Sequence, residues 1–478
     1  MRTRCVRLSF VSRRFLCRAL IFVAGALFES SVNPTVQGEE PTTKAAPGEL
    51  QWSVESSHAA LPAAGQNFWV RLRLHAPERT DANRELLNLS VVIDRSASMN
   101  VDAKIGFVRQ AGHILTDNLT PDDYISLVAY NHEVQLLVPM HPVVNREFLH
   151  HRIDELTAAG NTNISAGFLE GCAQLESRLR EPGQHHVLLL TDGLANRGVT
   201  DPRSLVALVQ RAKQRGIGVT TIGVGADFNE SLLTQMSQAG GGHYAYAANA
   251  DQIPTAVEKE LGSLLAVAAQ NVNFKMKLPT GIEVVQVYGH EEELQPDLLE
   301  KSLGDLTSGE ERRLLIKCRV APAFIAKGSE PFVLRAELNY DNLAAAQRSH
   351  SEQTIAFEQQ AAAPPANQTA TNPVLGYAQL VEDVDKIALA VKSMDRNLAG
   401  EVLRIRDQQF PALKKLAYST GDQDFVNKAF MFEYYSRELG ELIENGALHD
   451  HSVERAQLQK DLQYRRYMSD HHRGEHVH

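Results

Sequence analysis

The segment Val91-Val-Ile-Asp-Arg-Ser-Ala-Ser98 joins an apolar strand directly to three oxygen-bearing side chains. Asp94, Ser96 and Ser98 stand at alternate positions where the apolar residues end. Carboxylate and hydroxyl oxygens suit a small, hard divalent cation, which keeps some of its waters in a near-octahedral arrangement. The segment therefore predicts a buried strand that ends in part of a Mg²⁺ site.

This segment lies in residues 86–270, where apolar strands alternate with amphipathic helices. This alternation predicts an α/β fold with an open, doubly wound, mostly parallel sheet that helices cover on both faces. Ligands of such sheets bind at the carboxyl ends of the strands, where Asp94 and Asp192 fall. The expected strands are Leu87–Asp94, Tyr124–Tyr130, Val134–Val138, Val187–Thr191, Val219–Val224 and Tyr244–Ala247, and the expected helices are Val101–Leu119, Ile164–Leu179, Pro202–Arg215, Glu230–Gln238 and Asp251–Ala268.

The regions on either side, residues 39–85 and 271–358, have the period-two alternation of antiparallel strands. The early strands cannot bury a face alone. We therefore expect them to pair with the later strands in a β-sandwich, so that the α/β region is inserted in or flanked by that sandwich. The expected strands are at 50–54, 68–74, 272–278, 283–288, 312–318 and 332–338.

The rest of the chain predicts a linker at residues 359–372, followed by a C-terminal α-helical domain at residues 373–478. Breaks at Gly400, Pro411, Gly421 and Gly446 predict about four helices in this domain. We expect the histidine-rich end, residues 470–478, to be a frayed polar tail.

Residues 1–38 are predicted to be a signal peptide and leader. Six arginines precede the apolar run Ala19–Phe28, which is shorter than the roughly 20 residues that a membrane span needs. An uncleaved N-terminal anchor is the alternative. With the signal removed, no other stretch is long enough to span a membrane, so we expect an extracytoplasmic protein that is periplasmic, cell-surface or secreted.

The net charge argues against nucleic acid as a partner, because phosphate binding needs clustered Lys and Arg. The whole chain carries −10, and removing residues 1–38, with six arginines and one glutamate, changes this to −15. Of the four cysteines, only Cys172 and Cys318 lie beyond residue 38. They fall in different predicted domains, so we expect two buried free thiols, with a single bridge as the alternative.

The histidines of the α/β region do not form a zinc motif. No His-x-x-x-His pair lies near a carboxylate on a predicted helix. We expect solvated or loop positions for His132, His141, His150, His151, His185, His186 and His243.

Two further segments complete the predicted cation site. Ala159-Gly-Asn-Thr-Asn-Ile-Ser165 places Thr162 on a loop before a helix, and Leu188-Leu-Leu-Thr-Asp-Gly193 ends a buried strand in Asp192. Together with the first segment they resemble the metal-ion-dependent adhesion site of the von Willebrand factor type A domain family. The family pattern is Asp-x-Ser-x-Ser, a distant Thr and a strand ending in Thr-Asp-Gly. Ala97 stands where many members have glycine, which leaves every expected ligand in place.

The resemblance implies a role for each residue of the site. Ser96 and Ser98 would bind the cation directly, and Thr162 directly or through water. Asp94 and Asp192 would hold it directly or through waters and hydrogen-bond the serines. In this family a carboxylate from a protein partner fills the open coordination position. The implied cofactor is Mg²⁺, with Mn²⁺ or Ca²⁺ as alternatives, and the implied partner presents an Asp or Glu.

Three later segments, Thr191–Asp201, Thr221–Glu230 and Gly240–Tyr244, resemble secreted or surface members of the family. These members include inter-alpha-trypsin inhibitor heavy chains and bacterial secreted proteins, in which a β-domain flanks the type A domain. The resemblance therefore implies a non-enzymatic, extracytoplasmic module for protein binding or adhesion.

Three other functions are consistent with part of the pattern. A hydrolase needs a nucleophile with a base or a metal-activated water with an acid, and Ser96 and Ser98 have no histidine in their motifs. A subunit of an AAA ATPase or chelatase-type remodelling complex would be intracellular, and the chain has no Gly-x-x-x-x-Gly-Lys-Ser/Thr loop of its own. In a structural module of the cell envelope, the metal would only stabilise the fold.

Overall fold

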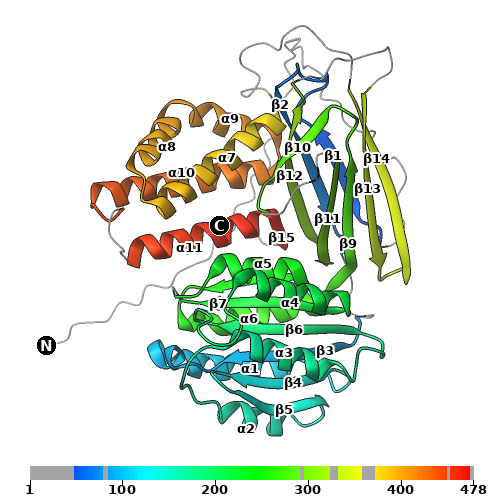
Figure 1. Cartoon of the computed structure of the whole chain (residues 1–478), viewed down its shortest axis with the longest axis vertical. Coiled ribbons are helices and arrows are strands. Elements are labelled where there is room, and N and C mark those ends of the chain that lie inside the picture. Colours follow the sequence, from blue (N-terminus) through cyan, green and yellow to red (C-terminus); the bar gives the residue numbers. More distant parts are fainter. Residues whose placement is uncertain are drawn as a thin grey trace, which may run out of the picture. The chain divides into compact units, whose positions relative to one another are not determined.

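The computed structural model describes residues 48–78, 84–225, 227–290, 295, 297–322, 332–357, 372–448 and 453–473. The predicted signal peptide lies outside these residues, as do most of the predicted linker and residues 474–478. The described chain contains a mostly parallel sheet with helices, two antiparallel sheets and a C-terminal helical region (Figure 1). The predicted fold class is confirmed.

The α/β region is built on a six-stranded sheet with the strand order β5-β4-β3-β6-β7-β8. All neighbouring strands are parallel except β5, which runs antiparallel to β4 at one edge. Every residue of β3 and β7 is buried, as expected for strands covered on both faces. The strands are β3 (Leu87–Asp94), β4 (Tyr124–Tyr130), β5 (Val134–Pro142), β6 (Gln184–Thr191), β7 (Ile217–Val224) and β8 (Gly241–Ala247).

Helices cover both faces of this sheet. One buried cluster joins α1, α2 and α6 to one face, and a second joins α3, α4 and α5 to the other. The predicted helix Asp251–Ala268 is too long, because its apolar end continues into a strand of the sandwich and an apolar run alone does not distinguish the two. The elements are η2 (Ala97–Ala103), α1 (Lys104–Asn118), α2 (Arg146–Asp154), α3 (Ile164–Leu175), α4 (Pro202–Gln214), α5 (Glu230–Gly240), η3 (Ala250–Gln252) and α6 (Ile253–Leu265).

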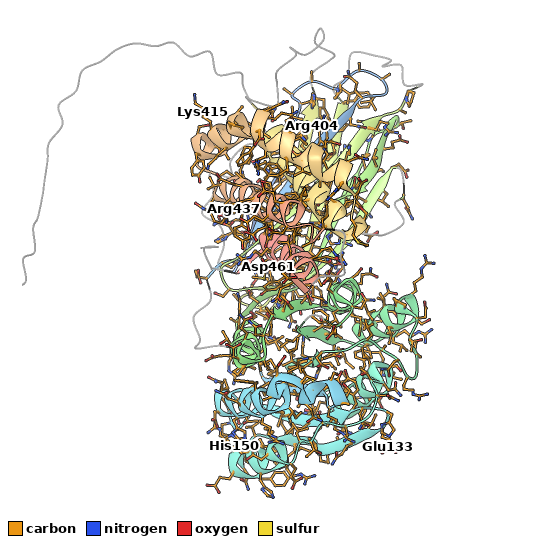
Figure 2. The ribbon with its side chains drawn as sticks, turned by 90° about the vertical axis from the view of Figure 1, so that its left-hand side faces the viewer. Glu133, His150, Arg404, Lys415, Arg437 and Asp461 are labelled. Atoms are coloured by element: carbon orange, nitrogen blue, oxygen red, sulfur yellow. The ribbon has the colours of Figure 1, made fainter. Side chains whose placement is uncertain are left out.

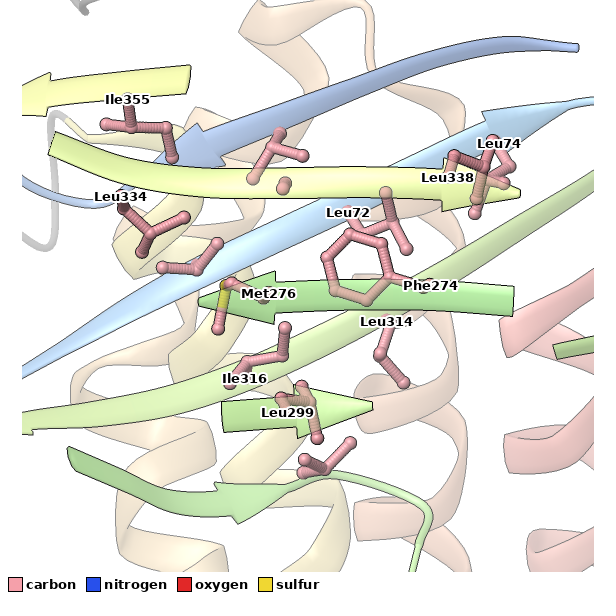
Figure 3. Close-up of a cluster of buried hydrophobic side chains, with 14 of the residues drawn as sticks. Leu72, Leu74, Phe274, Met276, Leu299, Leu314, Ile316, Leu334, Leu338 and Ile355 are labelled. Carbon is pink, nitrogen blue, oxygen red and sulfur yellow. The ribbon is translucent and has the colours of Figure 1, made fainter. Parts of the chain in front are cut away.

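Two antiparallel sheets enclose a separate apolar core, to which both contribute leucines and isoleucines and the second also contributes Phe274 and Met276 (Figure 3). In the first sheet, strand β2 pairs with β12, so that Leu72 lies opposite Leu314 and the early strands join the later ones. The first sheet has the order β1 (Gln51–Ser56), β2 (Asn67–His75), β12 (Glu310–Val320), β10 (Ile282–Val287), and the second has β11 (Leu298–Thr307), β9 (Val267–Lys277), β13 (Phe332–Asn342), β14 (Gln347–Phe357).

The described residues of the C-terminal region form five helices, where about four were predicted. Gly400 was expected to separate two of them and lies inside α8 instead. The break is at Met394, whose φ of 55° ends α7, and at Asp395, whose side chain caps α8. Arg404, Lys415 and Arg437 are exposed on three of the helices (Figure 2). The helices are α7 (Pro373–Ser393), α8 (Arg396–Gln408), α9 (Phe410–Thr420), α10 (Gln423–Glu444) and α11 (Val453–Asp470).

The predicted frayed tail is partly wrong. Residues His471–Arg473 form a short strand, β15, that pairs antiparallel with β12. A free strand edge offers backbone donors and acceptors that a polar segment can use regardless of its side chains.

Elsewhere, Cys172 and Cys318 are free and buried, as predicted. None of the described helices is long and apolar enough to cross a membrane.

The expectation of solvated or loop histidines is wrong for His186 in β6 and His243 in β8, which are both buried. His186 is only 4% exposed, and its Nε2 lies 2.9 Å from the Thr220 hydroxyl on the neighbouring strand. Burial, together with the nearby charges of His243 and Lys213, lowers the pKa of His186 to about 3. The folded protein therefore keeps this imidazole neutral.

The neutral state of His186 makes stability depend on pH. In the unfolded chain, His186 binds a proton below its ordinary pKa of 6.5. In the folded chain it binds this proton only near pH 3. The stabilising contribution is therefore present above pH 6.5 and is lost as the pH falls. Between pH 7 and pH 5 we expect the wild type to lose about 2 kcal/mol more unfolding free energy than His186→Gln, measured by urea denaturation. His151→Gln, at an exposed position, is the control and should follow the wild type. Equal losses in the wild type and His186→Gln would contradict the prediction.

Candidate functional site

The five predicted site residues come from three segments at one edge of the six-stranded sheet. Asp94 is the last residue of β3, and Asp192 follows the last residue of the neighbouring strand β6. The two strands are parallel, with Ile93 opposite Leu190, so their carboxyl ends meet. Ser96 and Ser98 follow β3, and Thr162 lies on the loop before α3.

Hydroxyl groups and one carboxylate meet directly at this edge. The Oγ atoms of Ser96 and Ser98 are 3.0 Å apart, and the Ser98 hydroxyl donates to Asp192 Oδ1 at 2.7 Å. A Cβ atom placed on Gly193 would lie 3.3 Å from Thr162 Oγ1 and 3.9 Å from Ser98 Oγ. Both hydroxyls therefore lie close to Gly193, and the structure brings Ser96, Ser98, Thr162 and Asp192 together.

Hydrogen bonds donated by backbone N–H groups hold the three segments together. The loop around Thr162 is tied to the first segment by two bonds, Ala97 N to Gly160 O at 3.0 Å and Ala159 N to Arg95 O at 2.8 Å. On its other side, Thr162 N donates to Asn196 Oδ1 at 2.9 Å. Ala97 is not among the residues with positive φ, so alanine in place of glycine strains nothing here.

Asp94 is fully buried and fixes the loop that carries the hydroxyls. Its Oδ1 accepts from the Ser96 backbone N–H at 2.8 Å, and its Oδ2 accepts from the Thr191 hydroxyl at 2.7 Å. The Tyr130 hydroxyl lies 3.5 Å from the same Oδ2. Burial raises the pKa of Asp94 to about 6, although the hydrogen bonds from Thr191 and Ser96 act in the opposite direction.

Sequence reasoning missed three residues that contact the two carboxylates. Thr191 and Tyr130 contact Asp94, and Lys104 Nζ lies 2.7 Å from Asp192 Oδ2. Thr191 carried a signal, because a polar residue in a buried strand needs a nearby partner. Lys104 carried none, because nothing local shows where the end of a long side chain will lie.

Three hydroxyls and two carboxylates form an oxygen-only donor set that fits a hard cation such as Mg²⁺. Nothing in this set favours a softer metal, because it contains no thiolate or imidazole. Across the described residues, no group of three or more His, Cys, Asp or Glu is arranged to hold a metal ion.

Comparison with known proteins identifies the α/β region. Residues 88–259 match the family model of the von Willebrand factor type A domain. The resemblance drawn from the sequence is thereby confirmed at the level of the domain.

Two relatives support this match. The chain is 25% identical over 253 residues to the YfbK protein of Escherichia coli (strain K12), which covers 52% of this chain and 43% of that protein. It is 29% identical over 163 residues to human inter-alpha-trypsin inhibitor heavy chain H4, which covers 32% of this chain and 17% of that protein. The chain thus covers less than half the length of either relative.

A solved structure extends the similarity beyond the α/β region. The von Willebrand factor type A protein from Catenulispora acidiphila matches with a TM-score of 0.59 at 15% identity, over 88% of this chain and 96% of that chain. At this identity the match shows a shared fold.

Thr191 tests the role of Asp94 in holding the loop. Thr191→Val keeps the shape of the side chain but removes the hydroxyl that donates to the buried carboxylate. We expect a loss of about 1.5–3 kcal/mol in unfolding free energy, as for hydrogen bonds to charged groups. Thr234→Val is the matched control, because the Thr234 hydroxyl is buried without a hydrogen-bond partner and should be replaceable at little cost. Chemical denaturation of both variants gives the comparison, and equal losses would show that the bond to Asp94 contributes nothing.

Proposed function

Because residues 88–259 form a von Willebrand factor type A domain, we propose that this chain is a non-enzymatic binding module that holds a divalent cation. Mg²⁺ is the cation that we propose, with Mn²⁺ and Ca²⁺ as alternatives. The cation would be held by Asp94, Ser96, Ser98, Thr162 and Asp192.

The observation that carries this proposal is the gathering of hydroxyl groups beside a buried carboxylate. Ser96 and Thr162 are buried, so their hydroxyls need polar partners inside the protein. Here the Ser96 and Ser98 Oγ atoms lie 3.0 Å apart at the edge where Asp192 is buried. A cation bound here would replace the hydrogen bond from Ser98 to Asp192, with Ser98 as a direct ligand and Asp192 acting directly or through water.

The partner that we propose is a protein that presents an Asp or Glu carboxylate. Five protein ligands, some of them acting through water, leave an octahedral cation room for one more oxygen. Two exposed apolar side chains follow the site residues closely in the chain, Val101 after Ser98 and Leu194 after Asp192, and each is 56% exposed. Apolar side chains beside a charged site favour a protein surface over a free ion as the ligand.

An enzymatic role has less support. The Ser98 hydroxyl donates to Asp192 and not to a histidine, so the serine lacks the histidine base that commonly activates a serine nucleophile. We also propose that the module works outside the cytoplasm, on the basis of the N-terminal sequence. That location separates it from an intracellular remodelling complex.

The metal site is tested by the effect of Mg²⁺ on stability. A cation that binds only the folded chain should stabilise it by about 2.7 kcal/mol at a concentration 100 times the Kd. We expect Ser98→Ala to lose most of this response, measured as the rise in Tm with added MgCl₂, because it removes a direct ligand. Ser126→Ala is the matched control, since Ser126 donates to Ser90 within the sheet and contacts no site residue. A Tm that MgCl₂ does not change in the wild type would refute the metal site.

The metal-bridged partner is tested by capture on the immobilised full chain. We expect a partner that binds with MgCl₂, is released by chelator and does not bind Asp94→Ala. Capture that is equal under all three conditions would refute the carboxylate bridge and favour a structural role for the metal.

A further inference from the structure

Lys104 brings a buried ammonium group to the same carboxylate as the serine hydroxyl. The residue is only 7% exposed, and its Nζ lies 2.7 Å from Asp192 Oδ2. The other oxygen of Asp192 accepts from Ser98. Both oxygens of a fully buried carboxylate are therefore engaged, one by a neutral donor and one by a full positive charge.

The position of Lys104 in the chain is unfavourable without this contact. It is the first residue of α1, where the positive end of the helix dipole disfavours a cation. The preceding residues Asp102 and Ala103 have φ values of 53° and 54°, a left-handed conformation that residues other than glycine rarely adopt. Ala103 caps the helix without a side-chain hydrogen bond. The local sequence therefore does not favour this arrangement, and the ion pair with Asp192 compensates for it.

We propose that Lys104 is a built-in counter-cation that sets the charge of the metal site, an inference that rests on the proposed function. The carboxylates of Asp94 and Asp192 and the ammonium of Lys104 sum to one negative charge. A bound divalent cation brings this sum to one positive charge, whereas without Lys104 the loaded site would be neutral. The lysine therefore weakens the binding of the metal and strengthens the attraction of the loaded site for an anionic ligand.

The physical basis is repulsion between two cations that share one carboxylate. A metal ion that approaches Asp192 Oδ1 comes close to the ammonium on Oδ2, and burial limits the screening by solvent. The metal must overcome this repulsion, and a partner carboxylate relieves it. Binding of the metal and binding of the acidic partner should therefore support each other.

Removing the charge of Lys104 tests the inference. Isothermal titration of MgCl₂ into the full chain should give a Kd at least about tenfold lower for Lys104→Met than for the wild type. Lys104→Gln, which is neutral but can still donate to Asp192, is the second variant if Lys104→Met does not fold. Acetate titrated into the Mg²⁺-saturated proteins should bind more weakly to both variants than to the wild type.

Lys460→Met is the matched control. Lys460 is also a buried lysine paired with a carboxylate, 3.5 Å from Glu230, and its Nζ donates to Phe228 O at 2.8 Å. Loss of this ion pair should lower Tm and leave the Kd for Mg²⁺ as in the wild type. Asp192→Ala should bind no Mg²⁺ in any background.

The outcomes separate this inference from the proposed function. If the wild type binds Mg²⁺ as tightly as both Lys104 variants, or more tightly, the role of Lys104 is overturned and the metal site still stands. If the Kd for Mg²⁺ falls as much in Lys460→Met as in the Lys104 variants, the role of Lys104 is also overturned, because the effect would then follow from the loss of any buried ion pair. No binding by the wild type or either Lys104 variant overturns the metal site and, with it, the inference.

Discussion

The parallel pairing of β3 with β6 is the constraint on which the candidate site depends. The two strands are in register from Leu87 opposite Gln184 to Ile93 opposite Leu190, and side chains of both are buried in the clusters on the two faces of the sheet. A one-residue slip of this register would move every side chain to the opposite face of the sheet and disrupt its packing against the helices. The strands must therefore end side by side, and the polar residues that follow them must share one edge.

Hydrogen bonds then turn this shared edge into a defined arrangement of oxygens. The loop that carries Thr162 is bonded on one side to the segment after β3 and on the other to Asn196 after β6. Asp94 holds the segment after β3 through Ser96 N–H, and the Thr191 hydroxyl of β6 holds Asp94 in place. Each of the three segments at the site is thus held by hydrogen bonds to a neighbouring segment. A cation that binds here would meet ligands that lose little further freedom, which is what preorganisation means for affinity.

The sequence predicted those parts of the fold that depend on local pattern. The bounds of β3 and β4 agree with the predicted ranges, because a run of apolar residues between polar ones marks a buried strand in a parallel sheet. β14 was missed because it is exposed along most of its length and has few apolar residues. The helix break predicted at Gly400 is wrong, since glycine within a helix costs only about 1 kcal/mol and neighbouring contacts can outweigh this cost. The ligand pattern of the site could be read from three motifs, whereas Lys104 could not, because its contact with Asp192 joins a helix to a different strand.

The way in which the α/β region joins the sandwich leaves the edge of the sheet that carries the site clear of both connections. The chain enters this region at Glu85 and leaves it after α6, and the side chains of Glu85 and Gln270 lie 3.3 Å apart. Both connections are therefore at the amino end of β3. Strand β3 is eight residues long and rises about 26 Å, so Asp94 lies at the far end of the strand from the connections. The connections and the site must lie at opposite edges of the sheet, because the connections precede β3 and the site residues follow it. An insertion joined to its host at the amino edge thus leaves the carboxyl edge, with its hydroxyls and exposed apolar side chains, free of the connecting chain.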